Sequence, residues 1–237
     1  MRTAGQAEAK TANLLLASLM QTEFARLQSS FNLINLKKKT VLYNAGDTVQ
    51  YCYFPTSGII SLLSTESEGK TVEVGMVGNE GMIGVSVLLQ TGVTPYDLMV
   101  QAEADALQID ARVLKAEFNR GGKLHALLLR YIYALLCQIS QSSVCHQFHL
   151  VEQRVARWLL MTRDRLQTNT FSLTQDFLAY MLGIPRTNVT MTAAALQQAG
   201  LISYKRGEII ITDEKGLEET SCDCYKIIKK ATDEILK

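Results

Sequence analysis

Residues 182–211 read LGIPRTNVTMTAAALQQAGLISYKRGEIII, and this stretch decides the fold. Pro185 suits the first turn of a helix, which we expect to span about residues 185–199. Gly200 is placed to end that helix, because glycine readily adopts the left-handed conformation of a helix C-terminus. The alternating apolar residues that follow predict a two-stranded hairpin with its turn near Arg206.

The residues just before this stretch predict a shorter helix that packs against the first. Thr174 is a candidate N-cap and Gly183 a candidate C-terminus for it. A helix, a tight turn, a second helix and a β-hairpin in this order indicate a winged helix-turn-helix. Its apolar positions can pack together while residues 186–188 stay outside. These positions are Phe177, Leu178, Met181, Val189, Ala193, Leu196 and Leu201.

The exposed start of the second helix has side chains suited to reading double-stranded DNA in the major groove. Arg186 can donate two hydrogen bonds to guanine, and Asn188 can pair with adenine. Thr187 and Thr190 can contact bases or phosphates, and Met191 can contact a thymine methyl group. A merely solvated helix more often starts with acids, which complement its dipole. The candidates for phosphate contacts are Thr174, Gln175, Lys205 and Arg206.

The composition is that of an ordinary globular protein. The chain has 237 residues, of which 47% are hydrophobic and 20% charged, and this length suits one large domain or two smaller ones. No run of 18 apolar residues and no secretory signal occur, so we expect no membrane span. The cysteines are odd in number and scattered, which favours reduced thiols in a cytoplasm. They are Cys52, Cys137, Cys145, Cys222 and Cys224.

The net charge of +1 says nothing about binding partners, but the distribution of charge along the chain says a little more. Residues 151–212 hold seven Lys and Arg against four acidic residues, whereas residues 213–237 hold five Lys and seven acidic residues. A modest positive excess therefore surrounds the predicted DNA reader. Residues 213–237 are predicted to form a further amphipathic helix, to which the sequence assigns no role.

Residues 39–112 indicate β-structure. Short β-branched and aromatic runs alternate with turn sequences such as NAGD and PTSG, which favours an antiparallel sandwich or roll. Upstream, residues 12–36 follow a helical period, with Leu15, Leu16, Leu19, Phe24 and Leu27 on one side. Glu73 and Glu80 flank a glycine-rich turn, where we expect both carboxylates to be solvated.

Residues 124–151 predict a long helix, because they carry one formal charge and neither proline nor glycine. The helix is apolar on two sides and must be covered on both. One stripe, which suits the chain's own β domain, is Leu124, Leu128, Tyr131 and Leu135. The other stripe suits a partner chain, as in a coiled coil, and its dimerisation candidates are Leu129, Ile132, Leu136, Ile139 and Ser143. A central helix of a monomer is the alternative.

A β-roll, a long apolar helix and a C-terminal winged helix, in this order, resemble the Crp/Fnr family of bacterial transcription regulators. The resemblance covers about residues 30–212, and LTQDFLAYMLGIPRTNVTMTAAALQQAGLI is close in spacing to the family's DNA-binding signature. Arg186 takes the place of the family's Arg at the start of the recognition helix. Thr187 replaces a Glu that is common there, and Met191 falls on a later Arg. The resemblance implies a palindromic operator with a different half-site, and RNA polymerase as a further partner.

The predicted roll departs further from the family. Members that bind cyclic nucleotides hold the ribose with a Gly-Glu pair and the cyclic phosphate with an Arg-Ser pair. Val85 stands in place of that Glu, and Pro95 and Tyr96 fall near the Arg-Ser. No Arg or Lys occurs over residues 71–111, so we expect an effector other than cyclic AMP, or none. Members with an iron–sulfur cluster carry cysteines near the N-terminus, whereas no cysteine precedes Cys52 here.

Metal sites have weaker support. Cys145, His146 and His149 share one helix end, but two or three ligands do not make a closed zinc site. A half-buried helix end explains these residues better. Cys222 and Cys224 are too close in sequence for opposing ligands and have no neighbouring histidine, so we assign no metal. Redox sensing by this pair of thiols stays open as an alternative.

We therefore predict an α+β protein in three parts, with a sensory β-roll domain and N-terminal helical segment over residues 1–120, a dimerisation helix over 121–150 and a winged-helix DNA reader over 151–237. The predicted function is a homodimeric, sequence-specific transcription regulator of the cytoplasm with an unknown effector. No nucleophile–base arrangement, phosphate-binding loop or dinucleotide fingerprint suggests an enzyme, and no cofactor is assigned. Two alternatives stay open: a ligand- or protein-interaction module that does not bind DNA, and a haem or metal sensor whose candidate ligands are His125, His146 and His149.

Overall fold

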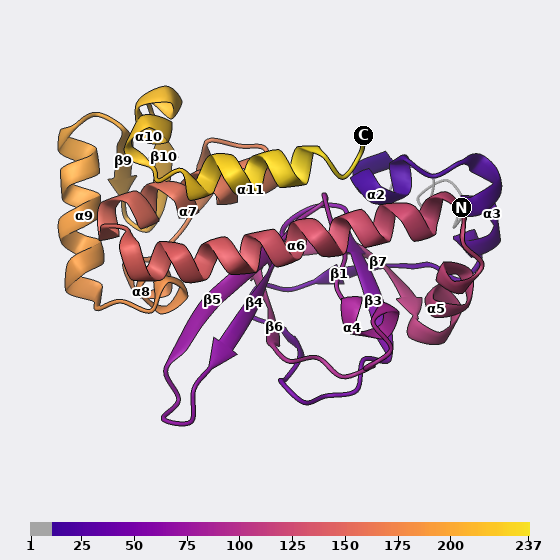
Figure 1. Ribbon diagram of the computed structural model, residues 1–237. Helices are drawn as coiled ribbons and strands as arrows, with labels where there is room; N and C mark the ends of the chain where they lie inside the picture. The colour runs from indigo at the N-terminus through magenta and orange to yellow at the C-terminus, as the bar shows by residue number, and fades with distance from the viewer. Residues whose placement is uncertain (1–10) are drawn as a thin grey trace.

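The computed structural model describes residues 11–237 as a β-roll, a long helix and a C-terminal helical unit with a small sheet (Figure 1). The α+β class and this order of parts confirm the prediction. Residues 1–10, which the predicted sensory domain includes, lie outside the described part. Among the described residues, no helix combines the length and apolar content needed to cross a membrane.

The roll is built from two antiparallel sheets. Its strands are β1 (Asn32–Leu36), β2 (Val41–Tyr43), β3 (Tyr51–Pro55), β4 (Ile59–Thr65), β5 (Thr71–Val77), β6 (Asp97–Ala102) and β7 (Ala104–Asp110). One sheet has the order β1-β7-β3 and the other the order β2-β6-β4-β5. Inward-facing residues of both sheets meet in one apolar core, as expected for sheets packed face to face.

The N-terminal segment forms shorter helices than predicted. They are α2 (Leu14–Ala17) and α3 (Gln21–Gln28), and their apolar stripe is buried as expected. The helical prediction is wrong for residues 32–36, which form β1 and pair with β7. The local period there is ambiguous, and the hydrogen bonds to a strand some 70 residues away decide the outcome. Two further short helices of this half are α4 (Val85–Leu88) and α5 (Ala111–Asn119).

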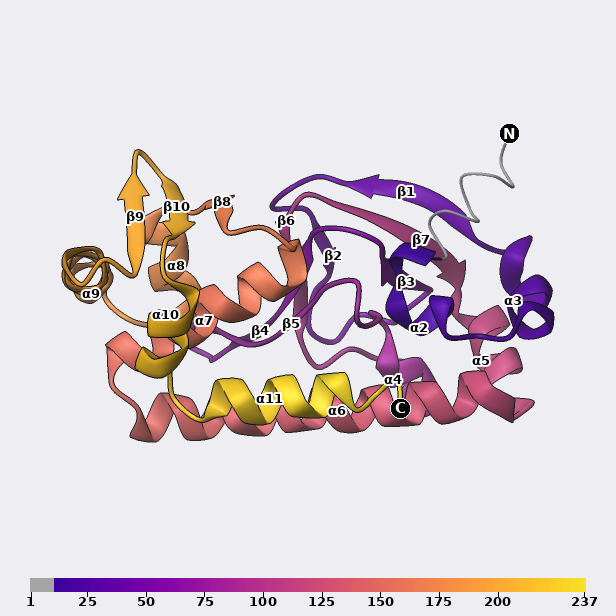
Figure 2. The same cartoon turned by 90° about the horizontal axis from the view of Figure 1, so that it is seen from above.

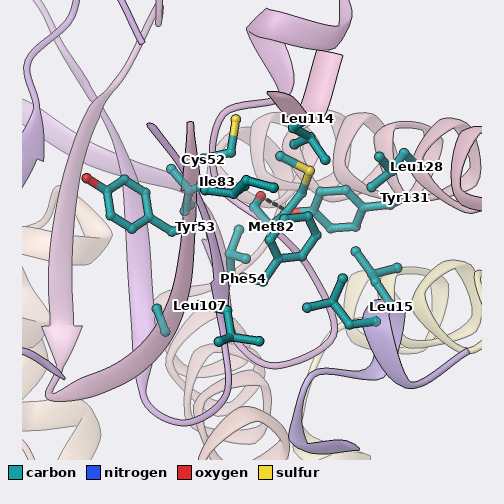
Figure 3. Packing of buried hydrophobic residues seen from close by; sticks show 14 of the residues in the cluster. Leu15, Cys52, Tyr53, Phe54, Met82, Ile83, Leu107, Leu114, Leu128 and Tyr131 are labelled. Atoms are coloured by element: carbon teal, nitrogen blue, oxygen red, sulfur yellow. Dashed lines mark hydrogen bonds between the residues drawn. The ribbon is translucent and has the colours of Figure 1, made fainter. Parts of the chain in front are cut away.

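The long helix α6 (Gly122–Phe148) runs along the roll, and its 27 residues span about 40 Å. The predicted inner stripe of Leu124, Leu128, Tyr131 and Leu135 is buried against the roll. Figure 3 shows Tyr131 reaching the roll, where its hydroxyl donates a hydrogen bond to the carbonyl oxygen of Met82 at 2.8 Å. A Cβ at Gly81 would lie 2.4 Å from the Tyr131 ring, so this close approach requires glycine.

The C-terminal unit follows a break after α6. Its elements are α7 (Val151–Leu166), β8 (Thr170–Ser172), α8 (Gln175–Leu182), α9 (Arg186–Gln198), β9 (Ile202–Lys205), β10 (Glu208–Ile211), α10 (Glu214–Thr220) and α11 (Cys224–Asp233). The small sheet has the order β8-β10-β9. The single helix predicted over residues 213–237 is wrong, since α10 and α11 are separate. Helix α11 lies alongside α6 in both views (Figures 1 and 2).

The C-terminal unit is docked on the roll through buried polar contacts. The Nε1 of Trp158 on α7 donates a hydrogen bond to Glu73 Oε2 at 2.6 Å, and Arg165 Nε lies 2.8 Å from Glu80 Oε1. Both glutamates were predicted to be solvated, and this is wrong, because α7 covers the turn that they flank. Buried ion pairs and hydrogen bonds between elements fix a geometry more than they add stability. Helix α7 is therefore held in one orientation against the roll.

Candidate nucleic-acid interface

The turn between α8 and α9 is set by local backbone chemistry. The hydroxyl oxygen of Thr174 accepts a hydrogen bond from the backbone N–H of Phe177 at 3.2 Å and so caps α8. Gly183 ends α8 with a φ of 61°, in the left-handed region that glycine adopts at least cost. Pro185 is the N-cap of α9. The helix predicted over about residues 185–199 is thus α9 with one cap residue at each end.

The inner face of the helix-turn-helix is apolar and packs against α7. The side chains of α9 that point inward lie four and seven residues apart, which is the spacing of one helix face. Six of the seven predicted interior positions are buried, and Phe177 is half-buried against the same core. The buried positions are Leu178, Met181, Val189, Ala193, Leu196 and Leu201.

The outer face of α9 begins with polar side chains that make few contacts. The Thr190 hydroxyl donates a hydrogen bond to Gln175 Oε1 at 2.7 Å, and Arg186 Nη1 lies 3.3 Å from Asp176 Oδ1. Both side chains of the Arg186 pair are more than 60% exposed, so the pair contributes about 0–1 kcal/mol and exchanges readily. The predicted base-contacting residues are all exposed: Arg186, Thr187, Asn188, Thr190 and Met191.

The β9–β10 hairpin forms the predicted wing. Arg206 and Gly207 have φ values of 52° and 80°, which is typical of the tight two-residue turn that matches strand twist. Lys205 and Arg206 are exposed at the tip, as predicted. The Tyr204 hydroxyl donates a hydrogen bond to the Leu173 carbonyl oxygen at 3.1 Å and ties the wing to the helices. Figure 2 shows the wing and α9 at the same end of the molecule.

The outward side of α6 carries a row of exposed side chains, most of them apolar. Leu129 and Leu136, two of the predicted dimerisation residues, are 47% and 57% exposed on it. Ile132 is buried within its own chain, so its assignment to the outer stripe is wrong; Tyr133, which the sequence reasoning missed, is 69% exposed instead. Ile139 is half-buried and Ser143 exposed. We call the following residues, three or four apart, the exposed α6 face: Leu129, Tyr133, Leu136, Ser140, Val144 and Phe148.

A cavity of about 310 Å³ lies between the roll and α6. The residues that line it include Val85, Pro95 and Tyr96, which lie at or near the sequence positions of the ribose- and phosphate-holding residues in members that bind cyclic nucleotides. Four α6 residues complete the wall: Ile132, Leu135, Leu136 and Ile139. None of the lining residues is charged, so the cavity has no cation for a phosphate.

The three histidines considered as haem ligands do not gather in one place. His125 stacks on Phe118 and lies 2.9 Å from the Phe118 carbonyl oxygen through Nδ1, near the start of α6. His146 is near the other end of α6, where burial and the charges of Arg154 and Arg157 lower its pKa to about 4. His149 is the C-cap of α6.

His149 instead meets three cysteines. We call Cys145, His149, Cys222 and Cys224 the thiol–imidazole cluster, whose sulfur and nitrogen atoms all lie within 4.8 Å of one another. The expectation that Cys222 and Cys224 have no neighbouring histidine holds only along the chain, and in space it is wrong. No local sequence signal could have found the cluster, because it forms only where the path of α11 brings residues 222–224 back to the end of α6.

Comparisons with known families agree with this arrangement of parts. Residues 33–120 match the family model of the cyclic nucleotide-binding domain, and residues 153–220 match that of the Crp-like helix-turn-helix domain. No curated protein matches the sequence.

Solved structures share the whole arrangement at low sequence identity. A protein of Eubacterium rectale, described as a transcriptional regulator of the Crp/Fnr family, is 20% identical with a TM-score of 0.67, over 87% of this chain and 96% of that one. A CRP-family transcriptional regulator of Thermus thermophilus is 18% identical with a TM-score of 0.66, over 79% and 96%. The c-di-GMP responsive global regulator CLP of Xanthomonas campestris is 16% identical with a TM-score of 0.63, over 81% and 99%. At this identity the likeness concerns the fold.

Proposed function

The chain belongs to the Crp/Fnr family of transcription regulators, and on this premise we propose that it is a homodimeric regulator that reads a specific DNA sequence with α9. The observation that carries the proposal is the exposed start of α9. Its inner face is fully used in packing, whereas Arg186, Thr187 and Asn188 project from the molecule with few intramolecular contacts. Side chains placed in this way are free to meet base edges in a major groove.

Each exposed residue of α9 and the wing has a role that its chemistry suits. Arg186 exchanges its exposed contact with Asp176 for a bidentate contact with guanine, and Asn188 pairs with adenine. Thr187 and Thr190 contact bases or phosphates, and Met191 covers a thymine methyl group. The residues proposed to hold phosphates, and so to position the protein without reading sequence, are Thr174, Gln175, Lys205 and Arg206.

The exposed α6 face supports the homodimer. It presents apolar side chains at coiled-coil spacing over most of a helix, a pattern that buries itself against a copy of the same helix about a two-fold axis. Two copies of α9 related by that axis would enter successive major grooves about 34 Å apart. The operator is therefore proposed to be palindromic, the proposed location is the bacterial cytoplasm, and RNA polymerase is a proposed further partner.

The cavity between the roll and α6 is the proposed effector site. Because no charged side chain lines it, an uncharged and largely apolar molecule suits it better than cyclic AMP. Leu136 both lines the cavity and belongs to the exposed α6 face. A bound molecule would thus touch the helix that pairs the two subunits, and it would bias the spacing of the two α9 helices.

The salt dependence of DNA binding tests whether DNA is the partner. Binding to a mixed-sequence duplex, followed by fluorescence anisotropy, is expected to weaken linearly in log affinity against log salt, because phosphate contacts release counterions. Lys205→Ala and Arg206→Ala are each expected to lower the slope by about 1. Cyclic AMP should leave the affinity unchanged, since no cation lines the cavity.

The matched control is Arg120→Ala. Arg120 has the same 64% side-chain exposure as Arg186 but lies after α5, at the far end of the molecule from α9. Its removal should leave the slope as in the wild type. A protein that binds no duplex at low salt, or whose affinity is independent of salt, would instead fit an interaction module whose partner is another protein.

A further inference from the structure

The thiol–imidazole cluster joins residues that are far apart in the sequence. Cys145 lies in the last turn of α6 and His149 caps that helix, whereas Cys222 precedes α11 and Cys224 is its first residue. Cys145 Sγ is 3.5 Å from Cys222 Sγ, and Cys224 Sγ is 3.6 Å from His149 Nδ1. Four donor atoms therefore come together from the end of one helix and the start of another.

These distances are those between neighbouring corners of a tetrahedral metal site. With zinc bonds of about 2.3 Å to sulfur and about 2.0–2.1 Å to nitrogen, tetrahedral geometry separates two sulfurs by about 3.8 Å and a sulfur from a nitrogen by about 3.6 Å. The two observed contacts agree with these values to within a few tenths of an ångström. The longest separation in the cluster, within 4.8 Å, would close by about 1 Å around a central ion.

The surroundings of the cluster suit a site with negative charge. Cys145, Cys222 and Cys224 are almost completely buried. The guanidinium of Arg157 is buried too, and it lies close enough to interact electrostatically with all three cysteines. Its Nε and that of the neighbouring Arg154 have no hydrogen-bond partner. Three thiolates around a divalent ion carry one net negative charge, which one buried guanidinium is enough to balance.

We propose that Cys145, His149, Cys222 and Cys224 bind one Zn²⁺ ion in each chain. Three cysteines and one histidine form a donor set of structural zinc sites, and four protein ligands leave no open position for a substrate. A ligand set within 4.8 Å encloses a single ion, whereas an iron–sulfur cluster holds its ligands further apart. The site goes beyond the proposed DNA binding and is independent of it.

The position of the site gives residues 213–237 a role. Zn²⁺ would connect the start of α11 to the end of α6, at the break where α7 and the DNA reader begin. A metal bridge between these segments holds the break in one geometry. The ion would therefore fix the orientation of the C-terminal unit relative to the helix that is proposed to pair the subunits.

Metal analysis of the reduced, full-length protein tests the proposal. Elemental analysis by mass spectrometry should find about one zinc per chain in the wild type, and Cys222→Ser and Cys224→Ser should each lose most of it. Cys137→Ser is the matched control, because Cys137 lies on α6, like Cys145, but outside the cluster, and this variant should retain the metal. Co²⁺ exchanged into the wild type should give the thiolate charge-transfer and visible bands of a tetrahedral site.

Several results would overturn the proposal. One is a wild-type protein that, with all thiols reduced, contains no zinc and takes up neither Zn²⁺ nor Co²⁺. Another is equal metal content in Cys222→Ser, Cys224→Ser and Cys137→Ser. A metal-free protein with a Cys145–Cys222 disulfide would show a redox pair instead. If the serine variants fail to fold, the Co²⁺ spectrum of the wild type still decides. No step uses DNA, so failure here leaves the proposed regulator untouched.

Discussion

Glu73 is a carboxylic acid enclosed where the β-roll meets α7. It is 6% exposed, and Trp158 donates a hydrogen bond to its Oε2. Burial raises the pKa of Glu73 to about 7, against the opposing effects of hydrogen bonding with Ser61 and Trp158 and of the charges on Arg157 and Arg165. The contact between the two halves of the chain therefore contains a group that titrates near neutrality.

The pKa of Glu73 predicts a pH dependence of stability. Because its folded-state pKa of about 7 lies above the usual 4.5, the native state binds this proton more tightly than the unfolded state. The free energy of unfolding should then fall as pH rises from about 4.5 to about 7, by up to about 3 kcal/mol. Glu73→Gln keeps an acceptor for Trp158 and removes the titration, so it should be stabilised relative to wild type more at pH 8 than at pH 5.

Denaturant unfolding at these two pH values measures the effect. Glu68→Gln is the control, because Glu68 is an exposed carboxylate on the roll and should leave the pH dependence unchanged. If Glu73→Gln and the wild type gave parallel stabilities at both pH values, the titration of Glu73 would not contribute.

For single residues, the sequence predicts positions that depend on local signals but not contacts with distant residues. The sequence places Arg186 at a helix start, because Pro185 and the preceding Gly183 are local signals. Nothing local tells that Glu73 faces Trp158, 85 positions away, or that Cys145 meets Cys222, 77 positions away. These contacts depend on how whole helices dock, and a local pattern has no access to that.

At the scale of elements, α6 shows how far periodicity can go. The spacing correctly predicted the stripe that packs on the roll. On the opposite side, Ile132 is three residues from Leu129 and Tyr133 is four, so the spacing allows either to be exposed. Only the packing of α6 against the roll shows that Ile132 is buried and Tyr133 exposed. The helix predicted for residues 32–36 is wrong because a local pattern does not show long-range pairing. The hydrogen bonds of β1 with β7 outweigh the helical period of its own sequence.

The exposed α6 face gives a test of the homodimer. Tyr133→Glu should raise the dimer dissociation constant by at least about 10-fold, because two carboxylates would meet near a two-fold axis in an apolar seam. The fold of each chain should survive, since Tyr133 is 69% exposed. Sedimentation equilibrium measures the constant.

Met20→Glu is the comparison for that experiment. Met20 is 61% exposed and precedes α3, away from the proposed seam, so its variant should dimerise like the wild type. A monomeric wild type, or equal dissociation constants for the two variants, would speak for α6 as the central helix of a monomer.

At the scale of the whole molecule, the two halves of the chain are joined at several points along α6 and α7. Arg165 and Trp158 of α7 reach the roll, α11 lies along α6, and the thiol–imidazole cluster sits at the break between α6 and α7. The order of the halves was predictable because each has its own sequence signature. Their docking was not, because it depends on buried polar pairs between distant residues.

The selection of DNA fragments tests the central claim most directly. Purified full-length protein, without added ligand, is mixed with genomic fragments beside Arg186→Ala and Arg120→Ala, and the bound DNA is sequenced. We predict that the wild type and Arg120→Ala recover one palindromic motif, with half-sites about one helical turn apart. Arg186→Ala should lose the motif or relax it at a guanine, at a cost of about 1–3 kcal/mol. Recovery of unrelated fragments by the wild type, or of the same motif equally well by Arg186→Ala, would contradict reading of DNA by α9.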